Sequence, residues 1–271
     1  RDVAPSRGLG DVYKRQPYHR EPITYEAPYL DNLPTAPREK FAANITAIRT
    51  LKSIEKRMAD GGPHANGEEQ EILAQYSGWG GLSDAFEPNK DSWHSEYTEL
   101  KSLLTEEEYA AARSSTLTAF YTPPEVIDAM YTTLRKMGVG AGTILEPSMG
   151  AGAFFGQSHS YLYEPTTRLF GVELDSLTGR IARQLYQKAN IQITGFEKAD
   201  LPDSFFDVAV GNVPFGQYQV NDKAYNRLGF NIHNYFFAKA LDQVRPGGVV
   251  AFVTSRYTMD AKDSTVRRYL A

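Results

Sequence analysis

Cysteine is absent from all 271 residues of this sequence. Its absence excludes disulfides, cysteine-ligated metal sites and a thiolate nucleophile, and it suits a protein of the cytoplasm. Long apolar runs are missing as well, since none approaches the roughly 20 residues of a membrane-spanning helix, and the first residues lack the apolar core of a signal peptide. We therefore expect a cytoplasmic protein without a membrane partner.

A surplus of positive charge is also missing. The 29 basic and 33 acidic residues give a formal net charge of −4. Nucleic-acid-binding domains usually carry a basic surplus. Any contact with nucleic acid must therefore be local, or must come from parts outside this sequence. The hydrophobic share of 41% and the charged share of 23% are those of an ordinary globular protein.

The first part of the chain divides into an arm and a helical region. Six prolines with little periodicity predict an extended, disordered arm over residues 1–37. Apolar residues at helical spacing predict a helix over 38–59, and a shorter one follows over 68–76. Another helix starts at Thr105, which forms a capping box with Glu108. This region, 38–115, also contains the glycine-rich turn SGWGGL at 77–82, and none of its motifs has an assignable chemistry.

From residue 116 onward, strands and helices alternate. A helix is predicted with Thr122 as N-cap, Pro123 at its first position and Glu125 closing a capping box. The segments TILEPS, RLFGVEL, IQITGF, FFDVAVGN and VVAFVTS are typical of strands, with helices between them. This alternation predicts an α/β fold with a doubly wound, mostly parallel, Rossmann-like sheet over 116–271. Ligands of such sheets bind beyond the carboxyl ends of the strands.

The first predicted strand ends in EPSMGAGAFFG, residues 146–156. Gly150 and Gly152 allow the backbone to pass close to a ligand. A dinucleotide fingerprint requires a third glycine where this chain has Phe155, so it is not met. The Glu146 carboxylate would repel a pyrophosphate but suits a ligand with an ammonium group. Alternatively, Glu146 caps the next helix and the glycines form only a tight turn.

Acidic residues also follow the second and third predicted strands. Glu173 is placed to accept both hydroxyls of a ribose, and Asp200 to accept from the exocyclic amine of an adenine. An amine, a ribose and an adenine without phosphate describe S-adenosylmethionine. A lone acid at a strand end is more often merely solvated. Four such features at successive strand ends favour a ligand site.

The fourth predicted strand leads into the sequence NVPF. Its members are Asn212, Val213, Pro214 and Phe215, so an amide, a rigid proline and an aromatic ring follow a buried apolar run. Taken alone, this is more typical of a turn with the ring folded into the core.

Together these motifs resemble those of a known family. FYTPPEV, EPSMGAG, GVEL, the turn at Asp200 and NVPF occur in the order of the gamma-class adenine-N6 DNA methyltransferases, over about residues 116–260. YSGWGGL and TSRYTMD further resemble the methylase-like region of large proteins of conjugative elements and phages, which often join it to a helicase. The chain departs from the family at Val213, where proline is more common.

The resemblance implies a fold, a cofactor, partners and site residues. The cofactor is S-adenosylmethionine, the partners are DNA with an adenine target and a fused or associated helicase region, and no metal is implied. The methyltransferase sheet usually has two more strands, so we expect a C-terminally truncated domain. The implied catalytic residues are Asn212, Val213, Pro214 and Phe215. The implied cofactor-binding residues are Tyr121, Thr122, Glu146, Pro147, Ser148, Gly150, Gly152, Glu173, Leu174, Asp200, Leu201 and Asn212.

The chemistry of adenine methylation explains the NVPF residues. The adenine amino nitrogen is a poor nucleophile because its lone pair is delocalised into the ring. Acceptance of its two hydrogens by the Asn212 side chain and by the carbonyl of residue 213 would direct the lone pair at the methyl group. Pro214 would fix the backbone, and Phe215 would stack on a base that has left the duplex. Transfer is direct, so no cysteine nucleophile is needed.

Two other classes of function stay open at this point. Similar tetrapeptides occur in methyltransferases that act on bases of RNA and on glutamine side chains of proteins, since these substrates also present a planar amine. A cofactor-binding but inactive module of a larger helicase-like protein is the second alternative. No target-recognition domain is visible in the sequence, so the DNA sequence recognised is not predicted.

Overall fold

The structure is a computed structural model that describes residues 22–23, 33–117, 121–140, 142–162 and 166–271. Most of the predicted arm over 1–37 lies outside the described residues. Within it, the Ile23 N–H donates to Gln187 Oε1 at 3.1 Å, and the Gln187 N–H donates to the Ile23 carbonyl at 3.2 Å. The chain at Ile23 is therefore tied to the segment that follows helix α7 (Ser176–Leu185).

The helical region begins with α1 (Pro37–Ala59), whose buried apolar stripe confirms the predicted amphipathic helix. It continues through α2 (Gly67–Leu73), α3 (His94–Leu103) and α4 (Glu106–Ser115). Helix α3 was not predicted. The capping box of α4 is confirmed, because Thr105 Oγ1 accepts from the Glu108 N–H at 3.2 Å and Glu108 Oε2 accepts from the Thr105 N–H at 2.9 Å.

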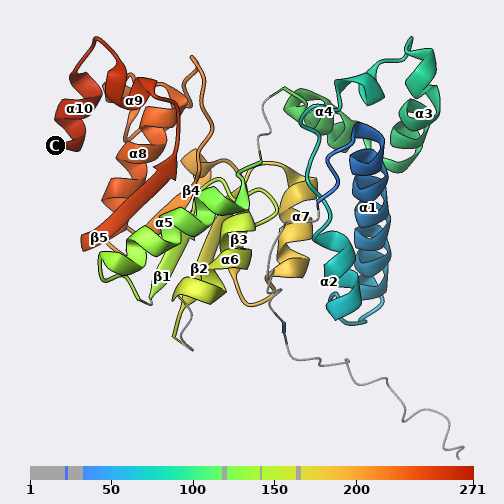
Figure 1. The fold of residues 1–271 in the computed structure, drawn as a ribbon, viewed down its shortest axis with the longest axis horizontal. Coiled ribbons are helices and arrows are strands. Elements are labelled where there is room, and N and C mark those ends of the chain that lie inside the picture. The colour runs from blue at the N-terminus through green and yellow to red at the C-terminus, as the bar shows by residue number, and fades with distance from the viewer. Residues whose placement is uncertain (1–21, 24–32, 118–120, 141, 163–165) are drawn as a thin grey trace, which may run out of the picture.

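The second half of the chain forms a five-stranded parallel sheet, which confirms the predicted α/β class (Figure 1). Its strands are β1 (Thr143–Glu146), β2 (Arg168–Glu173), β3 (Asn190–Ile193), β4 (Phe206–Asn212) and β5 (Val244–Val253). They lie in the order β3-β2-β1-β4-β5. The order reverses between β1 and β4, which is where ligands of such sheets bind.

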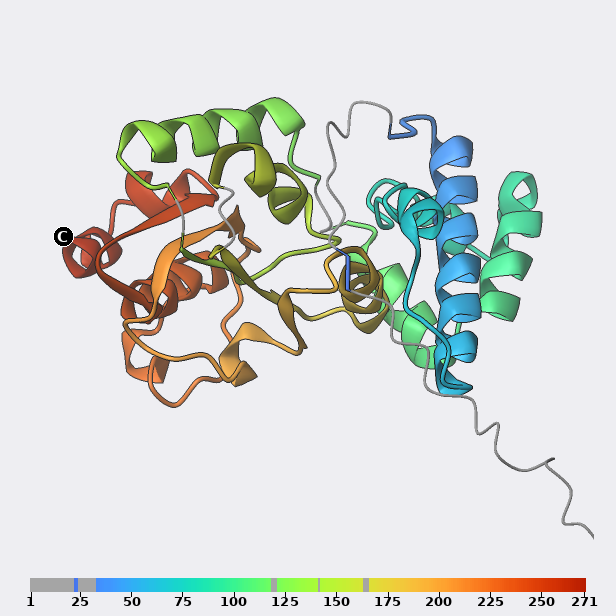
Figure 2. The same ribbon diagram turned by 90° about the horizontal axis from the view of Figure 1, so that it is seen from below.

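Helices cover both faces of this sheet (Figure 2). They are α5 (Pro124–Lys136), α6 (Ala153–Leu162), α7 and α8 (Ile232–Gln243), followed by the short α9 (Tyr257–Asp260) and α10 (Thr265–Leu270). Successive strand residues point to opposite faces. Accordingly, Ile144 of β1 packs with α5 and α6, whereas the adjacent Leu145 packs with α8. Among the described residues, no helix combines the length and apolar character that crossing a membrane requires.

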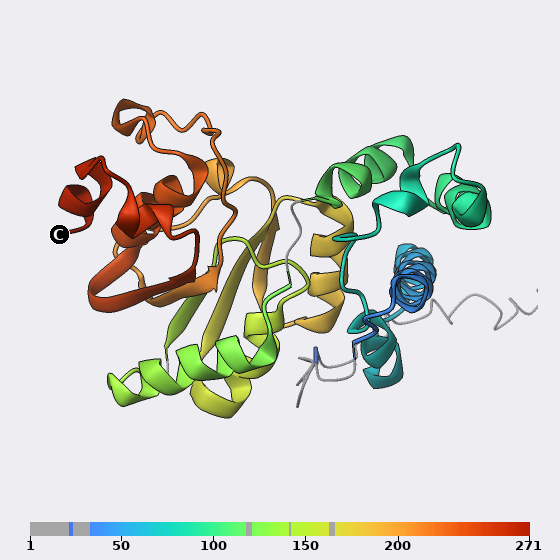
Figure 3. The same ribbon diagram turned by 45° about the horizontal axis from the view of Figure 1, so that its top comes forward.

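Helix α7 joins the sheet to the helical region (Figures 1 and 3). One buried cluster contains Leu51 of α1, Trp79 of the glycine-rich turn and Ile181 of α7. Gln70 of α2, itself buried, donates to the Gln184 carbonyl at 2.8 Å and to the Leu185 carbonyl at 3.0 Å. The two regions therefore share one continuous core, and the predicted division near residue 116 stays a prediction.

The predicted N-cap of helix α5 is wrong. The helix begins at Pro124 with Pro123 in the N-cap position, and no side chain caps it. Thr122 therefore lies one residue before the cap, where its hydroxyl cannot form the predicted capping box with Glu125. Thr122 is instead buried at the edge of the cavity described below.

Candidate functional site

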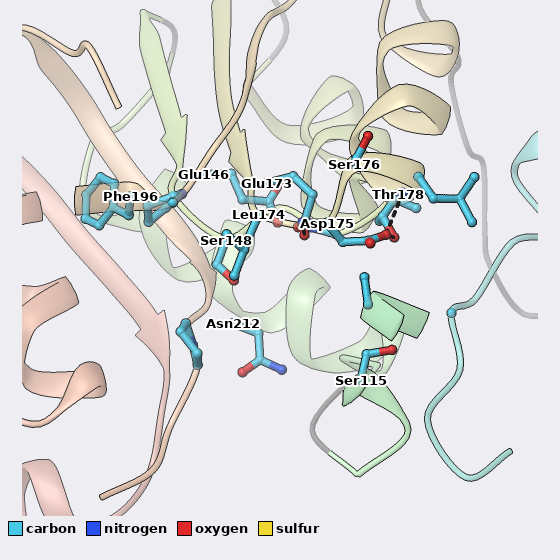
Figure 4. Close-up of a pocket in the computed structure, with 18 of the residues that line it drawn as sticks. Ser115, Glu146, Ser148, Glu173, Leu174, Asp175, Ser176, Thr178, Phe196 and Asn212 are labelled. Carbon is cyan, nitrogen blue, oxygen red and sulfur yellow. Dashed lines mark hydrogen bonds between the residues drawn. The ribbon is translucent and has the colours of Figure 1, made fainter. Parts of the chain in front are cut away.

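A cavity of about 1190 Å³ lies at the carboxyl ends of the strands, between the sheet and the helical region. Figure 4 shows side chains from the ends of β1, β2 and β4 directed toward it, with Ser115 of α4 approaching from the helical region. Most residues expected from the sequence line it: Tyr121, Thr122, Glu146, Pro147, Ser148, Gly150, Glu173, Leu174, Asn212, Val213, Pro214 and Phe215. Gly152, Asp200 and Leu201 are not part of the lining.

Glu146 is the last residue of β1 and is only 2% exposed. Its Oε2 atom is buried and has no hydrogen-bond partner in the part of the chain that the structure describes. Burial, helped by the charge of Glu173, raises the pKa of Glu146 well above its ordinary value. Gly211 of β4 lies beside it, since a Cβ atom there would stand 3.4 Å from Glu146 Cγ. A buried acceptor without a partner is costly, so this site favours a ligand that donates.

Glu173 ends β2 and holds the loop that follows β1. Its Oε2 accepts from the Gly150 N–H at 2.8 Å, and its Oε1 accepts from the Asp175 N–H at 2.8 Å. Gly150 has a φ of +56°, a conformation that glycine adopts without strain. Burial raises the pKa of Glu173 to about 7, although the backbone N–H groups act in the opposite direction.

Asn212 ends β4, and its side chain projects into the same cavity (Figure 4). Its Oδ1 atom is buried and, like Glu146 Oε2, has no hydrogen-bond partner among the described residues. The next residue, Val213, is 1% exposed, and its N–H donates to the Val253 carbonyl of β5 at 3.1 Å. Phe215 is 43% exposed at the cavity wall. The alternative interpretation of NVPF, a turn with its ring in the core, therefore does not hold for Phe215.

Gly152 approaches a side chain of the protein rather than the cavity. A Cβ atom at Gly152 would stand 2.2 Å from the Tyr186 ring, and the Tyr186 hydroxyl donates to the Gly152 carbonyl at 2.7 Å. The positive φ of Gly152 therefore serves the packing of the β1 loop against the end of α7.

Asp200 does not reach the cavity. It is exposed, and its backbone is paired with the Gln192 side chain at 2.7 and 2.8 Å. Strand β3 ends at Ile193, and a 3₁₀ turn over Phe196–Lys198 carries the chain away before Asp200. Residues 194–197 line the cavity in its place. Leu201 packs against the cluster around α8. Phe196 and Glu197 thus line the cavity at the end of β3, where Asp200 was expected.

Sequence reasoning missed the contribution of the helical region to this cavity. Its lining residues there include Tyr76, Ser77, Gly78, Glu107, Glu108, Ser114 and Ser115. The available signal was the glycine-rich turn at 77–82, which had no assigned chemistry. Three of the lining residues lie in or beside that turn.

The charged residues of the cavity lining are mostly acidic. They are Glu107, Glu108, Glu146, Glu173, Asp175 and Glu197, against the single base Arg180. Arg180 is already paired with Glu55 at 2.9 Å and with Glu108. Such a cavity favours a positively charged ligand and disfavours phosphate groups. The described residues contain no group of three or more His, Asp or Glu side chains arranged to hold a metal ion.

The family model of N-6 DNA methylases matches residues 103–271 of this chain. The chain belongs to the N-6 DNA methylase family. The match includes every strand of the sheet together with α4, so the family region extends into the helical region.

Comparison with known proteins finds similar sequences and structures. Defense against restriction protein B of Escherichia phage P1 is 27% identical over 240 residues, which cover 87% of this N-6 DNA methylase chain and 9% of the phage protein. A type I restriction-modification methyltransferase subunit from Streptococcus thermophilus is 17% identical, with a TM-score of 0.48 over 84% of this chain and 59% of that one. An S-adenosylmethionine-dependent methyltransferase from Mesorhizobium loti is 22% identical, with a TM-score of 0.34 over 46% and 54%. The assignment rests on the family match.

Proposed function

We propose that this chain transfers a methyl group from S-adenosylmethionine to the N6 amino group of adenine in DNA. One observation supports this most directly. Two buried acceptors without partners among the described residues, Glu146 Oε2 and Asn212 Oδ1, line a single cavity in a member of the N-6 DNA methylase family. The proposed reaction would bring two hydrogen-bond donors to this cavity. They are the ammonium group of S-adenosylmethionine and the N6 amino group of adenine.

The residues present fit the proposed cofactor. When bound, S-adenosylmethionine supplies a methyl group activated by its sulfonium charge. Glu146 would accept from the ammonium group, and Glu173 would accept from the ribose hydroxyls. The acidic lining suits a ligand with a net positive charge. The cavity of about 1190 Å³ exceeds the roughly 300–1,000 Å³ of a typical small-molecule site, which leaves room for a base beside the cofactor.

The end of β4 would act on the target base. Asn212 Oδ1 would accept one amino hydrogen of adenine and the Val213 carbonyl the other, which directs the nitrogen lone pair toward the methyl group. Half-exposed Phe215 would stack on the base after it leaves the duplex. The methyl group would move directly to nitrogen. Val213 supplies only a backbone carbonyl, so the departure from the family's usual proline leaves this step unchanged.

The proposal also covers the cellular location and the partners of this chain. The chain would act in the cytoplasm on DNA, with a helicase region as a fused or associated partner. The phage protein is far longer than the matched segment, since the alignment covers 9% of it. Further parts of such a protein would supply the contacts that select a DNA sequence, in line with the net charge of −4 in this chain.

Two measurements test the proposal. Calorimetry should detect binding of S-adenosylmethionine but not of NAD, whose phosphates meet an acidic cavity. Tritiated methyl transfer to unmethylated DNA, followed by digestion to nucleosides, should yield N6-methyladenine. If RNA or protein acquires the tritium label and DNA does not, the substrate belongs to another class. Cofactor binding without transfer to any of these substrates would identify an inactive module.

A further inference from the structure

The glycine-rich turn at 77–82 is held rigidly by helix α1. Asn44, which is fully buried, donates to the Gly78 carbonyl at 2.7 Å and accepts from the Ser77 N–H at 3.0 Å. Lys40 donates to the Gly80 carbonyl at 2.7 Å. Trp79 is 2% exposed, with its ring centre 5.4 Å from that of Phe86. The turn is therefore a fixed surface of the helical region.

This turn lies against the segment of the sheet that carries Glu173. Tyr76, which precedes the turn, has its hydroxyl 3.4 Å from Thr178 Oγ1. The Thr178 N–H donates to Asp175 Oδ2 at 2.8 Å, and the Thr178 hydroxyl donates to the same oxygen (Figure 4). The Asp175 N–H in turn donates to Glu173 Oε1 at 2.8 Å. Hydrogen bonds therefore run from the helical region to the carboxylate that would accept from a ribose.

Two residues of the turn are also open to a ligand in the cavity. One has a hydroxyl without a hydrogen-bond partner among the described residues, and the other has empty space at its Cβ position. Ser77 Oγ is buried, and the described residues offer it no hydrogen-bond partner. Gly78 has a φ of +71°, and a Cβ atom there would meet nothing within 4 Å. Both residues line the cavity. A ligand in the cavity can therefore approach the turn backbone closely and pair with the Ser77 hydroxyl.

We propose that Ser77 and Gly78, at the start of this turn, form a cofactor-binding element that the helical region contributes to the methyltransferase site. The Ser77 hydroxyl pairs with the ribose of S-adenosylmethionine, which Glu173 holds from the sheet. Gly78 keeps the space that this ribose needs. The inference rests on the proposed function and assigns a role to the helical region within it.

The turn offers a matched pair of glycines for the test. Gly81 has a φ of +77° and equally open space around its Cβ position, but it does not line the cavity. Asparagine tolerates this left-handed conformation better than other non-glycine residues. Calorimetry on the whole 271-residue chain should show that Gly78→Asn weakens binding of S-adenosylmethionine by about tenfold or more, the scale of a clash in a filled site. Gly81→Asn should leave the dissociation constant within about twofold of the unsubstituted chain.

Ser77 gives a second and gentler variant. Ser77→Ala should weaken binding by about 2- to 12-fold, the value of one hydrogen bond, whereas Ser77→Thr retains the hydroxyl and should restore most of the affinity. Thermal unfolding without cofactor should be nearly unchanged in both.

The outcomes separate this inference from the proposed function. Equal loss of affinity in Gly78→Asn and Gly81→Asn, or unchanged affinity in both Gly78→Asn and Ser77→Ala, would overturn the role of the turn alone. If the Gly78→Asn variant does not fold, the comparison of Ser77→Ala with Ser77→Thr tests the inference. Failure of the unsubstituted chain to bind S-adenosylmethionine would overturn the proposed function, and the inference with it.

Discussion

The cavity has two walls that differ in how their polar groups are satisfied. On the sheet wall, Glu146 Oε2 and Asn212 Oδ1 are buried without partners among the described residues. On the helical wall, the Ser115 hydroxyl donates to the Ala112 carbonyl at 2.8 Å, and Glu108 is paired with Lys52 at 2.9 Å and with Arg180. Apart from Ser77, the polar groups discussed on the helical wall are used within the protein.

This difference separates structural from functional polar groups. A buried acceptor without a donor costs about 1–3 kcal/mol of stability. On the sheet wall this cost arises at Glu146 and Asn212, the two positions to which the proposed reaction would bring hydrogen-bond donors. On the helical wall, Glu108 is paired with Lys52 of α1 and Arg180 of α7, which holds α4 against both helices. Apart from Ser77 and Gly78, substitutions on the two walls should therefore affect different quantities: ligand binding and rate on the sheet wall, and unfolding on the helical wall.

The largest expected effect is at Asn212. Asn212→Ala should lower the rate of methyl transfer by about a hundredfold to a thousandfold, the usual loss for one preorganised hydrogen-bonding group. Cofactor affinity should change little, because the proposed partner of Asn212 is the target amine. Single-turnover transfer of a tritiated methyl group measures the rate.

Ser115→Ala is the matched control on the opposite wall, because its hydroxyl is already bonded to the Ala112 carbonyl. Its rate should stay within a few-fold of the unsubstituted chain. A loss at Ser115 equal to that at Asn212 would contradict the division between the two walls.

The next effect is on stability, at the contact between the helical region and α7. Gln70→Ala removes the donor that serves the carbonyls of Gln184 and Leu185, all in buried positions. We expect the free energy of unfolding to fall by about 1–3 kcal/mol, measured by urea denaturation. Glu71→Ala, at an exposed position of the same helix, should change it by less than about 0.5 kcal/mol. Equal losses of unfolding free energy in Gln70→Ala and Glu71→Ala would show that the hydrogen bonds of Gln70 make no specific contribution to stability.

A smaller effect is the pH dependence of cofactor affinity, which we attribute to Glu173 on the sheet wall. The pKa of Glu173 is raised to about 7, and only its ionised form would accept both ribose hydroxyls of the proposed cofactor. Affinity for S-adenosylmethionine should therefore rise with pH up to about 7 and level off above it, with a slope of at most about tenfold per pH unit from this group. Calorimetry at about pH 6, 7 and 8 measures the slope, and Glu173→Gln should reduce it. A flat profile in the unsubstituted chain would exclude Glu173 as the acceptor.

The same raised pKa has the opposite consequence for folding. The ordinary value of 4.5 applies to the unfolded chain, so between about pH 4.5 and 7 the folded protein binds more protons than the unfolded one. The contribution of Glu173 to stability is therefore present at low pH and is lost as pH rises toward 7. Binding and stability should respond to pH in opposite directions over this interval.

The sequence allowed the sheet and the place of its cavity to be predicted, because strand ends in an α/β fold meet at one edge whatever the details. Glu146, Glu173 and Asn212 reach the cavity for this reason. Asp200 was expected at this edge but does not line the cavity, because the exit of the chain from β3 depends on a 3₁₀ turn that has no strong sequence signal. The helical wall was not predicted because its contacts with α7 join residues more than 70 positions apart.

The smallest effect concerns the residue where the chain departs from its family. The resemblance alone predicts that Val213→Pro is tolerated, because only the carbonyl of this residue takes part in the proposed reaction. The structure adds a cost, because the Val213 N–H donates to the Val253 carbonyl at 3.1 Å and proline has no N–H. We expect a loss of about 0.5–1.5 kcal/mol in the free energy of unfolding, measured by urea denaturation, with a rate of methyl transfer within a few-fold of the unsubstituted chain. Val213→Ala keeps the N–H and is the comparison for the loss of side-chain packing alone. A loss of turnover as large as that of Asn212→Ala, with normal stability, would mean that the side chain of residue 213 takes part in catalysis and that the backbone carbonyl is not its only contribution.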